Sequence, residues 1–76
     1  MPNLSDEREI IDGLFQDAED ALGRGALGKA SLLYQGILRS APDHVGALRQ
    51  LAALEANLGD PAIALTLFER AQELNP

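Results

Sequence analysis

Apolar residues recur at helical spacing along the whole chain. In each of four segments they follow steps of i, i+3, i+4 and i+7, which line one face of a helix with 3.6 residues per turn. Alternation with a period of two is absent, and Thr, Val and aromatic residues are scarce, so strands are not expected. The sequence therefore predicts an all-α chain, with helices over 6–22, 27–40, 44–57 and 61–74.

Polar residues near the starts of three of these helices are suited to cap them. Asp60 precedes Pro61, and a proline at the first helical position needs no partner for the amide that it lacks. Asp43 stands before the third predicted helix, where its carboxylate can accept from free backbone amides. Asp6, with Glu9 three residues later, makes an acceptable start for the first helix.

Glycines mark the predicted helix ends. The stretch GRG at 23–25 and Gly59 are natural stops, because glycine adopts the left-handed conformation at little cost. The remaining connections are only a few residues long. Consecutive helices are therefore expected to lie antiparallel.

The chain repeats itself at an offset of 34 residues. When 11–42 is aligned with 45–76, seven of the 32 pairs are identical. These pairs are Leu14/Leu48, Gln16/Gln50, Ala18/Ala52, Gly25/Gly59, Ala30/Ala64, Leu33/Leu67 and Pro42/Pro76. The paired alanines would let two antiparallel helices approach closely, the glycine would turn them, and the proline would end the unit. The repeat predicts two helical hairpins of similar construction.

A helix–turn–helix unit of this length resembles the tetratricopeptide repeat. The family pattern is an apolar residue, a small residue four later, glycine at the turn, alanine early in the second helix, an aromatic four later, and a final proline. These positions are filled by Leu14, Ala18, Gly25, Ala30, Tyr34 and Pro42, then by Leu48, Ala52, Gly59, Ala64, Phe68 and Pro76. The resemblance implies one domain over 1–76, with repeat 1 at about 11–44 and repeat 2 at about 45–76. It also implies two hairpins stacked as a short right-handed solenoid, an α–α superhelix.

The first copy follows this pattern less closely than the second. Polar or small residues replace common apolar ones at Asp17, Ala21 and Ser31. Three glycines, each costing up to ~1 kcal/mol relative to alanine in an exposed helix interior, also fall in this copy. They are Gly13, Gly28 and Gly36. We therefore expect the first copy to be the less stable one.

The negative charge of the chain lies on its first segment. The formal net charge is −6, and the first twenty residues hold seven acids against Arg8 alone. The seven are Asp6, Glu7, Glu9, Asp12, Asp17, Glu19 and Asp20. Such a surface repels phosphate backbones, so neither nucleic acid nor an anionic membrane is an expected partner. Two interpretations stay open: a solvated helix face near a helix N-terminus, where the dipole favours carboxylates, and a docking surface for a basic partner.

Length and composition set further limits. At 76 residues the chain is short for an independent core, and without cysteine it can form neither disulfides nor thiolate metal sites. No apolar run approaches the ~18–20 residues that span a bilayer. The first eight residues are polar and acidic, unlike a signal peptide. We expect a soluble, cytoplasmic protein.

Candidate catalytic groups are few. His44 is the only histidine and has no second ligand in view, so we expect it to be structural or exposed. The stretch GRGALGK at 23–29 lacks the preceding strand and the spacing of a phosphate loop, and indicates a helix–helix turn. On a helix, the carboxylates of Asp17, Glu19 and Asp20 would point apart and miss the geometry of a calcium loop. We expect no catalytic residue, no metal and no cofactor.

The resemblance implies a binding groove lined by the first helix of each repeat. Carried over by position, its residues are Asp12, Phe15, Gln16 and Glu19, with Arg49, Gln50, Ala53 and Asn57. Phe15 is either partly buried against the neighbouring helix or an exposed anchor for a partner. Arg49 pairs either with a ligand carboxylate or, as we expect, with Glu19. Phe15 and Glu19 also replace the Lys and Asn of the chaperone-binding carboxylate clamp, so acidic chaperone tails are not expected ligands.

The last predicted helix has an apolar face that a following helix would normally cover. Its exposed residues are expected to be Phe68, Ala71 and Leu74. Stacked repeats bury a core only between neighbours, so about three repeats and a capping helix are usual. Either the chain is a fragment of a longer repeat protein, or a second copy covers this face in a homodimer.

Two functional interpretations follow from these features. The first is a protein–protein interaction module or scaffold that binds a peptide or helix and has no catalysis of its own. The second is the N-terminal repeat region of a larger bacterial enzyme, since sulfotransferases, glycosyltransferases and aspartyl/asparaginyl β-hydroxylase-like oxygenases can carry such regions. The reading frame beyond Pro76 would distinguish the two.

Overall fold

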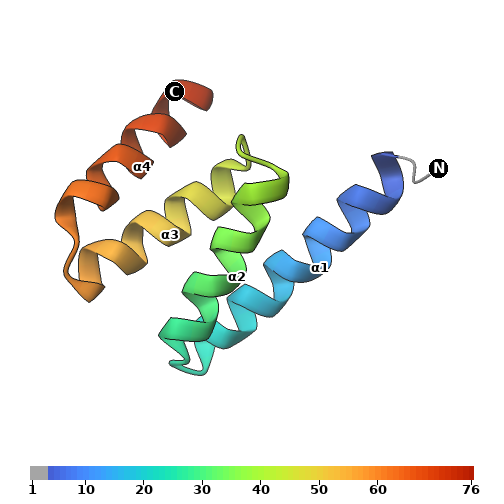
Figure 1. Ribbon diagram of the computed structural model, residues 1–76, viewed down its shortest axis with the longest axis horizontal. Helices are drawn as coiled ribbons and strands as arrows, with labels where there is room; N and C mark the ends of the chain where they lie inside the picture. Colours follow the sequence, from blue (N-terminus) through green and yellow to red (C-terminus); the bar gives the residue numbers. More distant parts are fainter. Residues whose placement is uncertain (1–3) are drawn as a thin grey trace.

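A computed structural model describes residues 4–76, and this part of the chain is four α-helices without a strand (Figure 1). The helices are α1 (Leu4–Gly23), α2 (Leu27–Ser40), α3 (Val45–Leu58) and α4 (Pro61–Leu74). Helix α1 packs on α2, α2 on α3, and α3 on α4, so each helix contacts its neighbours in sequence. The prediction of an all-α chain built from helical hairpins is confirmed.

The predicted helix boundaries are close to the observed ones. The ranges 27–40 and 61–74 are confirmed to the residue, and the third helix runs over 45–58 instead of 44–57. Helix α1 begins at Leu4, so the predicted start with Asp6 and Glu9 is wrong. Asp6 lies inside the first turn, where the helix dipole still favours its carboxylate.

Of the two other predicted caps, that of Asp60 is confirmed and that of Asp43 is wrong. Oδ1 of Asp60 accepts a hydrogen bond from the amide of Ile63 at 3.3 Å, and Pro61 is the first residue of α4. Helix α3 is capped by His44 instead of Asp43: Nδ1 of His44 accepts from the amide of Ala47 at 3.0 Å. Because α3 begins at residue 45, the side chain immediately before it makes the cap.

Both hairpin turns depend on a glycine with positive φ. Gly25 has a φ of 77° and Gly59 a φ of 106°, values that other residues adopt only with strain. Gly59 ends α3, and the next amide, that of Asp60, donates to the carbonyl of Glu55 at 2.9 Å. The predicted glycine stops are therefore confirmed at both turns.

Small residues form the contacts within each hairpin. Ala18 and Ala30 in the first hairpin and Ala52 in the second are fully buried, and Ala64 is nearly so. Helices can approach closely where only a methyl group separates their backbones. The repeated alanines therefore set the spacing of each helix pair.

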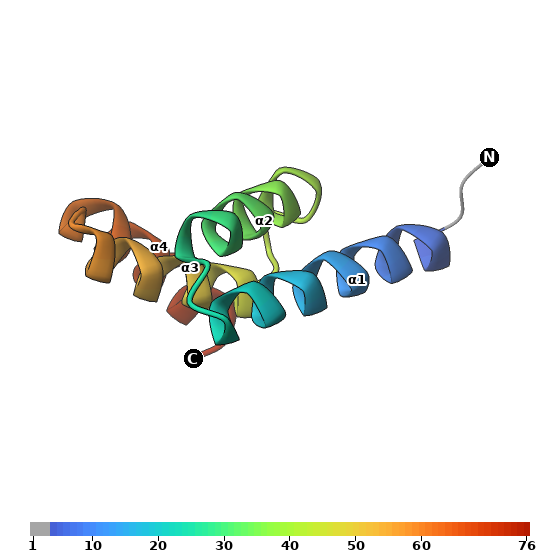
Figure 2. The ribbon, with the colours of Figure 1, turned by 90° about the horizontal axis from the view of Figure 1, so that it is seen from below.

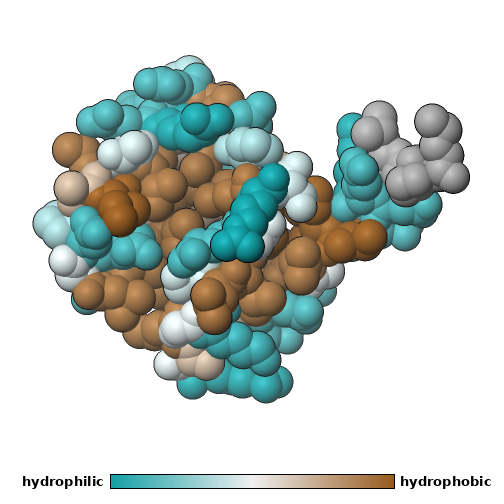
Figure 3. Space-filling model, in the orientation of Figure 1, coloured by the Kyte–Doolittle hydropathy of each residue, from teal (hydrophilic) through white to brown (hydrophobic). Residues whose placement is uncertain are grey.

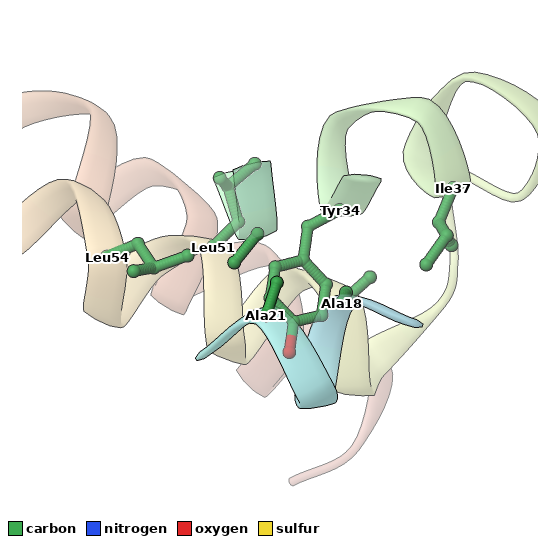
Figure 4. Close-up of a cluster of buried hydrophobic side chains, with 8 residues drawn as sticks. Ala18, Ala21, Tyr34, Ile37, Leu51 and Leu54 are labelled. Atoms are coloured by element: carbon green, nitrogen blue, oxygen red, sulfur yellow. The ribbon is translucent and has the colours of Figure 1, made fainter. Parts of the chain in front are cut away.

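Larger side chains fill the junction between the hairpins. Tyr34 extends from α2 toward Ala18 and Ala21 of α1, and Leu51 and Leu54 approach from α3 (Figure 4). All five side chains belong to one buried cluster. Burial of this kind contributes about 25 cal/mol per Å² of apolar surface, so this cluster stabilises the packing of α1, α2 and α3 against one another.

Burial is lightest on the last helix. Only Ala64 and Ala71 of α4 are buried, whereas α2 buries Tyr34 and Ile37. Helix α3 of the same copy buries five residues, so burial differs between the helices of a copy more than between the two copies. The lower stability of the first copy stays a prediction.

The molecule is elongated, with extents of 40 × 30 × 17 Å. Helix α2 lies across α1 and α3, and the first turns of α1 extend beyond the other helices (Figure 2). Among the helices of residues 4–76, none is both long and apolar enough to cross a membrane.

Candidate interaction surface

Four residues predicted to line a groove form one strip along α1. Asp12, Phe15, Gln16 and Glu19 are spaced by three or four residues, which places them on one side of the helix. Asp12 and Gln16 are exposed, and Phe15 and Glu19 are half-buried. The strip therefore has a polar outer edge and an inner edge that contacts other helices.

The ring of Phe15 is wedged between three helices. Its centroid lies 5.7 Å from that of Tyr34 on α2, edge to face at 65°, and 5.0 Å from that of His44 at the start of α3. Gly46 lies beneath it: a Cβ atom there would be 3.0 Å from Cζ of Phe15. Phe15 is thus partly buried, one of the two roles predicted for it, and part of the ring still faces solvent.

Glu19 connects α1 to both α2 and α3. Its Oε1 accepts a hydrogen bond from the hydroxyl of Tyr34 at 2.6 Å and another from Nε2 of Gln50 at 3.2 Å. Burial raises the pKa of the Tyr34 hydroxyl above its usual range, and the hydrogen bond and negative charge of Glu19 raise it further. The carboxylate therefore holds three helices in register and is not a free charge on the surface.

The groove residues predicted on α3 do not all face the same surface. Gln50 faces Glu19, but Arg49 lines a hollow with Phe68 of α4, so the predicted pairing of Arg49 with Glu19 is wrong. Two consecutive residues of a helix point about 100° apart, and the shorter Gln50 is the one that faces α1. Asn57 is exposed and donates to the carbonyl of Ala53 in its own helix at 3.0 Å.

A shallow hollow of about 410 Å³ lies on the α1 strip. It is lined by Phe15, Gln16, Glu19 and Asp20, of which Asp20 was not among the predicted groove residues. Asp12 adds another exposed carboxylate on the same helix. The hollow therefore combines one aromatic ring with an acidic surround.

His44 has a structural role in α3. Its Nδ1 accepts the capping hydrogen bond from Ala47, and its ring contacts Phe15. Within residues 4–76, no cluster of three or more histidine or carboxylate side chains could hold a metal ion. The sequence analysis missed the capping role of His44 because it placed the start of the third helix at residue 44 instead of 45.

The exposed apolar surface of α4 differs from the predicted one. Phe68 is 43% exposed and Leu74 41% exposed, but Ala71 is only 2% exposed because it packs in the hairpin with α3. The prediction for Ala71 is therefore wrong. Leu65, which the sequence analysis did not single out, is 59% exposed. Hydrophobic residues are exposed over α3 and α4 in Figure 3, whereas the far end of α1 is mostly hydrophilic.

The two hairpins correspond in burial at the alanines that pack within each helix pair. Ala18 and Ala52 are both buried, as are Ala30 and Ala64.

The chain matches no protein-family model, no curated protein and no solved structure. Function is therefore inferred from the chain's own residues and their arrangement.

Proposed function

We propose that this chain is a protein-interaction module without catalysis of its own. In this proposal the two hairpins stack as a short right-handed solenoid of the tetratricopeptide type. The first helices of the hairpins, α1 and α3, line a groove that receives an extended peptide or a helix of a partner protein. The observation that carries the proposal is the hydrogen bond of Glu19 to Gln50, since it joins the two predicted groove strips.

Phe15 is the proposed anchor of the site. Its ring is held from below by contacts with Tyr34 and His44, so a partner side chain would meet a rigid aromatic surface. Rigid aromatic anchors contribute strongly at interfaces, because little conformational entropy is lost when they are covered.

The charge of the surface favours a basic partner. Asp12 and Asp20 are exposed near Phe15, and the first twenty residues carry seven acids against one base. Lysine and arginine side chains would be attracted to this face, and acidic segments would be repelled. The expected ligand is a peptide or helix that presents an apolar side chain flanked by lysine or arginine.

The proposal is tested by titrating the isotope-labelled chain with two synthetic peptides of equal length. One peptide carries lysine and arginine around a central apolar residue, and the other carries glutamate and aspartate at the same positions. We expect the basic peptide to shift the amide resonances of Phe15, Gln16 and Gln50. Exchange of Asp12 and Asp20 for lysine should weaken this binding at least about tenfold, or about 1.4 kcal/mol.

The matched control is Glu73→Lys, which makes the same kind of charge change on an exposed position of α4. It should leave binding of the basic peptide nearly unchanged. Equal binding of both peptides, or shifts confined to α4, would exclude the proposed groove.

A further inference from the structure

The face of α4 that points away from α3 corresponds to a buried face of the first hairpin. At the offset of 34 residues, Leu65 and Phe68 correspond to Ser31 and Tyr34. Ser31 and Tyr34 are buried in the first hairpin, where α3 packs on α2. Leu65 and Phe68 are 59% and 43% exposed, and we call this the C-terminal face.

A hollow of about 320 Å³ lies on the C-terminal face. It is lined by Arg49, Phe68, Ala71, Gln72, Asn75 and Pro76. Their counterparts in the first hairpin include Phe15, whose ring contacts His44 at the start of α3. They also include Tyr34 and Ile37, which belong to the buried core. The chain itself thus shows that a helix fits a surface of this construction.

We infer that two copies of the chain pair through this face, with α4 of one copy against α4 of the other about a two-fold axis. The buried Ser31 of the covered hairpin has the more apolar Leu65 as its exposed counterpart in the uncovered one. The exposed apolar side chains of Leu65 and Phe68 are consistent with coverage of this face by another protein surface. In a two-fold interface, Leu65 and Phe68 would meet the same residues of the other copy.

The charge distribution favours this occupant. All of the formal net charge of −6 lies in the first twenty residues, whereas the remaining residues carry five acids and five bases. Residues 45–76 hold four acids and two bases, so two copies that meet through α4 bring together hairpins with a formal charge of −2 each and keep their acidic α1 helices at opposite ends. Repulsion between the copies is therefore smaller than the charge of −6 per chain would give.

The alternative head-to-tail arrangement, with α1 of one copy on α4 of the next, is disfavoured. In α3 the residues that cover the first hairpin include Leu51 and Leu54, which are buried. The corresponding residues of α1 are Asp17 and Asp20. Burying these carboxylates against the apolar ring of Phe68 would be unfavourable, because they would lose their hydration without gaining a partner. The acidic end of the chain thus prevents an open filament and leaves a closed dimer.

The test is the molar mass of the full chain in solution, measured by sedimentation equilibrium from below to well above micromolar concentration. We expect the mass to rise from one chain to two and then to stop. Leu65→Glu and Phe68→Glu should each raise the dissociation constant at least about tenfold, the equivalent of about 1.4 kcal/mol.

The matched control is Leu32→Glu, because Leu32 is 70% exposed and lies on α2. This variant should leave the dissociation constant unchanged, and circular dichroism should give all variants the helicity of the parent chain. A fully helical parent that stays monomeric throughout the range would overturn the inference. A mass that keeps growing beyond two chains would also overturn it. The same holds if Leu32→Glu raises the dissociation constant as much as Leu65→Glu does.

The arrangement of the two copies is tested separately with a spin label. Because the chain has no cysteine, Gln72→Cys provides a single attachment site next to Phe68. Mixed with an isotope-labelled copy, the spin label should broaden the resonances of α4 in that copy. Broadening of α1 instead would show head-to-tail contact and overturn the two-fold arrangement.

Discussion

The hydroxyl of Tyr34 lies 2.6 Å from Oε1 of Glu19, and this hydrogen bond joins α2 to α1 beneath the proposed groove. Tyr34 is fully buried, so its hydroxyl is shielded from solvent. The same oxygen of Glu19 accepts from Gln50, which extends the connection to α3. A buried donor that finds its acceptor only in the correct packing favours one arrangement of three helices over others.

The first prediction concerns the alkaline stability of the fold. An unfolded tyrosine has a pKa of about 10, and the folded-state pKa of Tyr34 is higher. The hydroxyl therefore stabilises the fold fully below about pH 10, and this contribution is lost as the pH rises from there toward the folded-state pKa. Melting followed by circular dichroism should show a steep loss of stability above about pH 10.

Tyr34→Phe is the matching variant. It should cost about 1–2 kcal/mol at neutral pH, because the hydrogen bond to a charged acceptor is lost, and it should remove most of the additional alkaline loss. Since Tyr34 is the only tyrosine and the chain has no tryptophan, tyrosinate absorbance reports this one group. A parallel decline of both proteins with pH would show that Tyr34 is not the titrating group.

The second prediction compares two glycines that each stand second in a helix, Gly28 in α2 and Gly46 in α3. A Cβ at Gly28 meets no other atom within 4 Å, so Gly28→Ala should stabilise the chain by up to ~1 kcal/mol. A Cβ at Gly46 would lie 3.0 and 3.1 Å from two ring atoms of Phe15, which Tyr34 and His44 hold in place.

Gly46→Ala should therefore be at least about 1 kcal/mol less favourable than Gly28→Ala in urea unfolding. In a Phe15→Leu background this difference should shrink, because the smaller side chain leaves space for the added methyl group. Equal effects of the two alanines in the parent chain would mean that the ring of Phe15 moves freely.

The third prediction separates the two contacts of His44. His44→Ala removes the cap of α3 and the ring contact with Phe15, and should cost about 1–2 kcal/mol. His44→Asn should recover the cap, and His44→Phe the ring contact, so each should lie between alanine and the parent in thermal melting. Asp43→Ala is the neighbouring control and should change stability little, since its bond to Arg70 is on the surface. A larger loss for Asp43→Ala than for His44→Ala would contradict the capping assignment.

The helix boundaries were predicted well because the residues that begin and end a helix lie within a few positions of the boundary. Asp60 followed by Pro61 determines a helix start within two residues, and Gly59 with positive φ determines the preceding stop. Neighbouring residues alone did not decide whether Asp43 or His44 caps α3. The choice depends on the residue at which α3 begins, and the cap residue His44 also contacts Phe15 of another helix.

The groove residues of α1 and α3 were predicted to line one surface, and in the structure they do not all lie together. Glu19 was paired with Arg49 because opposite charges attract, yet Gln50 occupies the position that faces α1. Ala71 was assigned to the exposed face from helical spacing, which cannot distinguish the side facing α3 from the side facing solvent. Both errors concern how a helix is rotated against its neighbour, and that rotation depends on packing between distant residues.

The last prediction concerns local stability along the chain. In a single copy, α4 buries only two alanines, so its backbone hydrogen bonds should open at a lower free energy than those of α2. At the lowest practical concentration, amide hydrogens around Leu67 should exchange faster than those around Leu33, its counterpart in the first hairpin. At high concentration the exchange of α4 should slow if two copies cover it, and the rate in Leu65→Glu should stay fast. Slower exchange in α4 than in α2 at every concentration would contradict the burial pattern, and would place the weak part of the fold in the glycine-containing first hairpin.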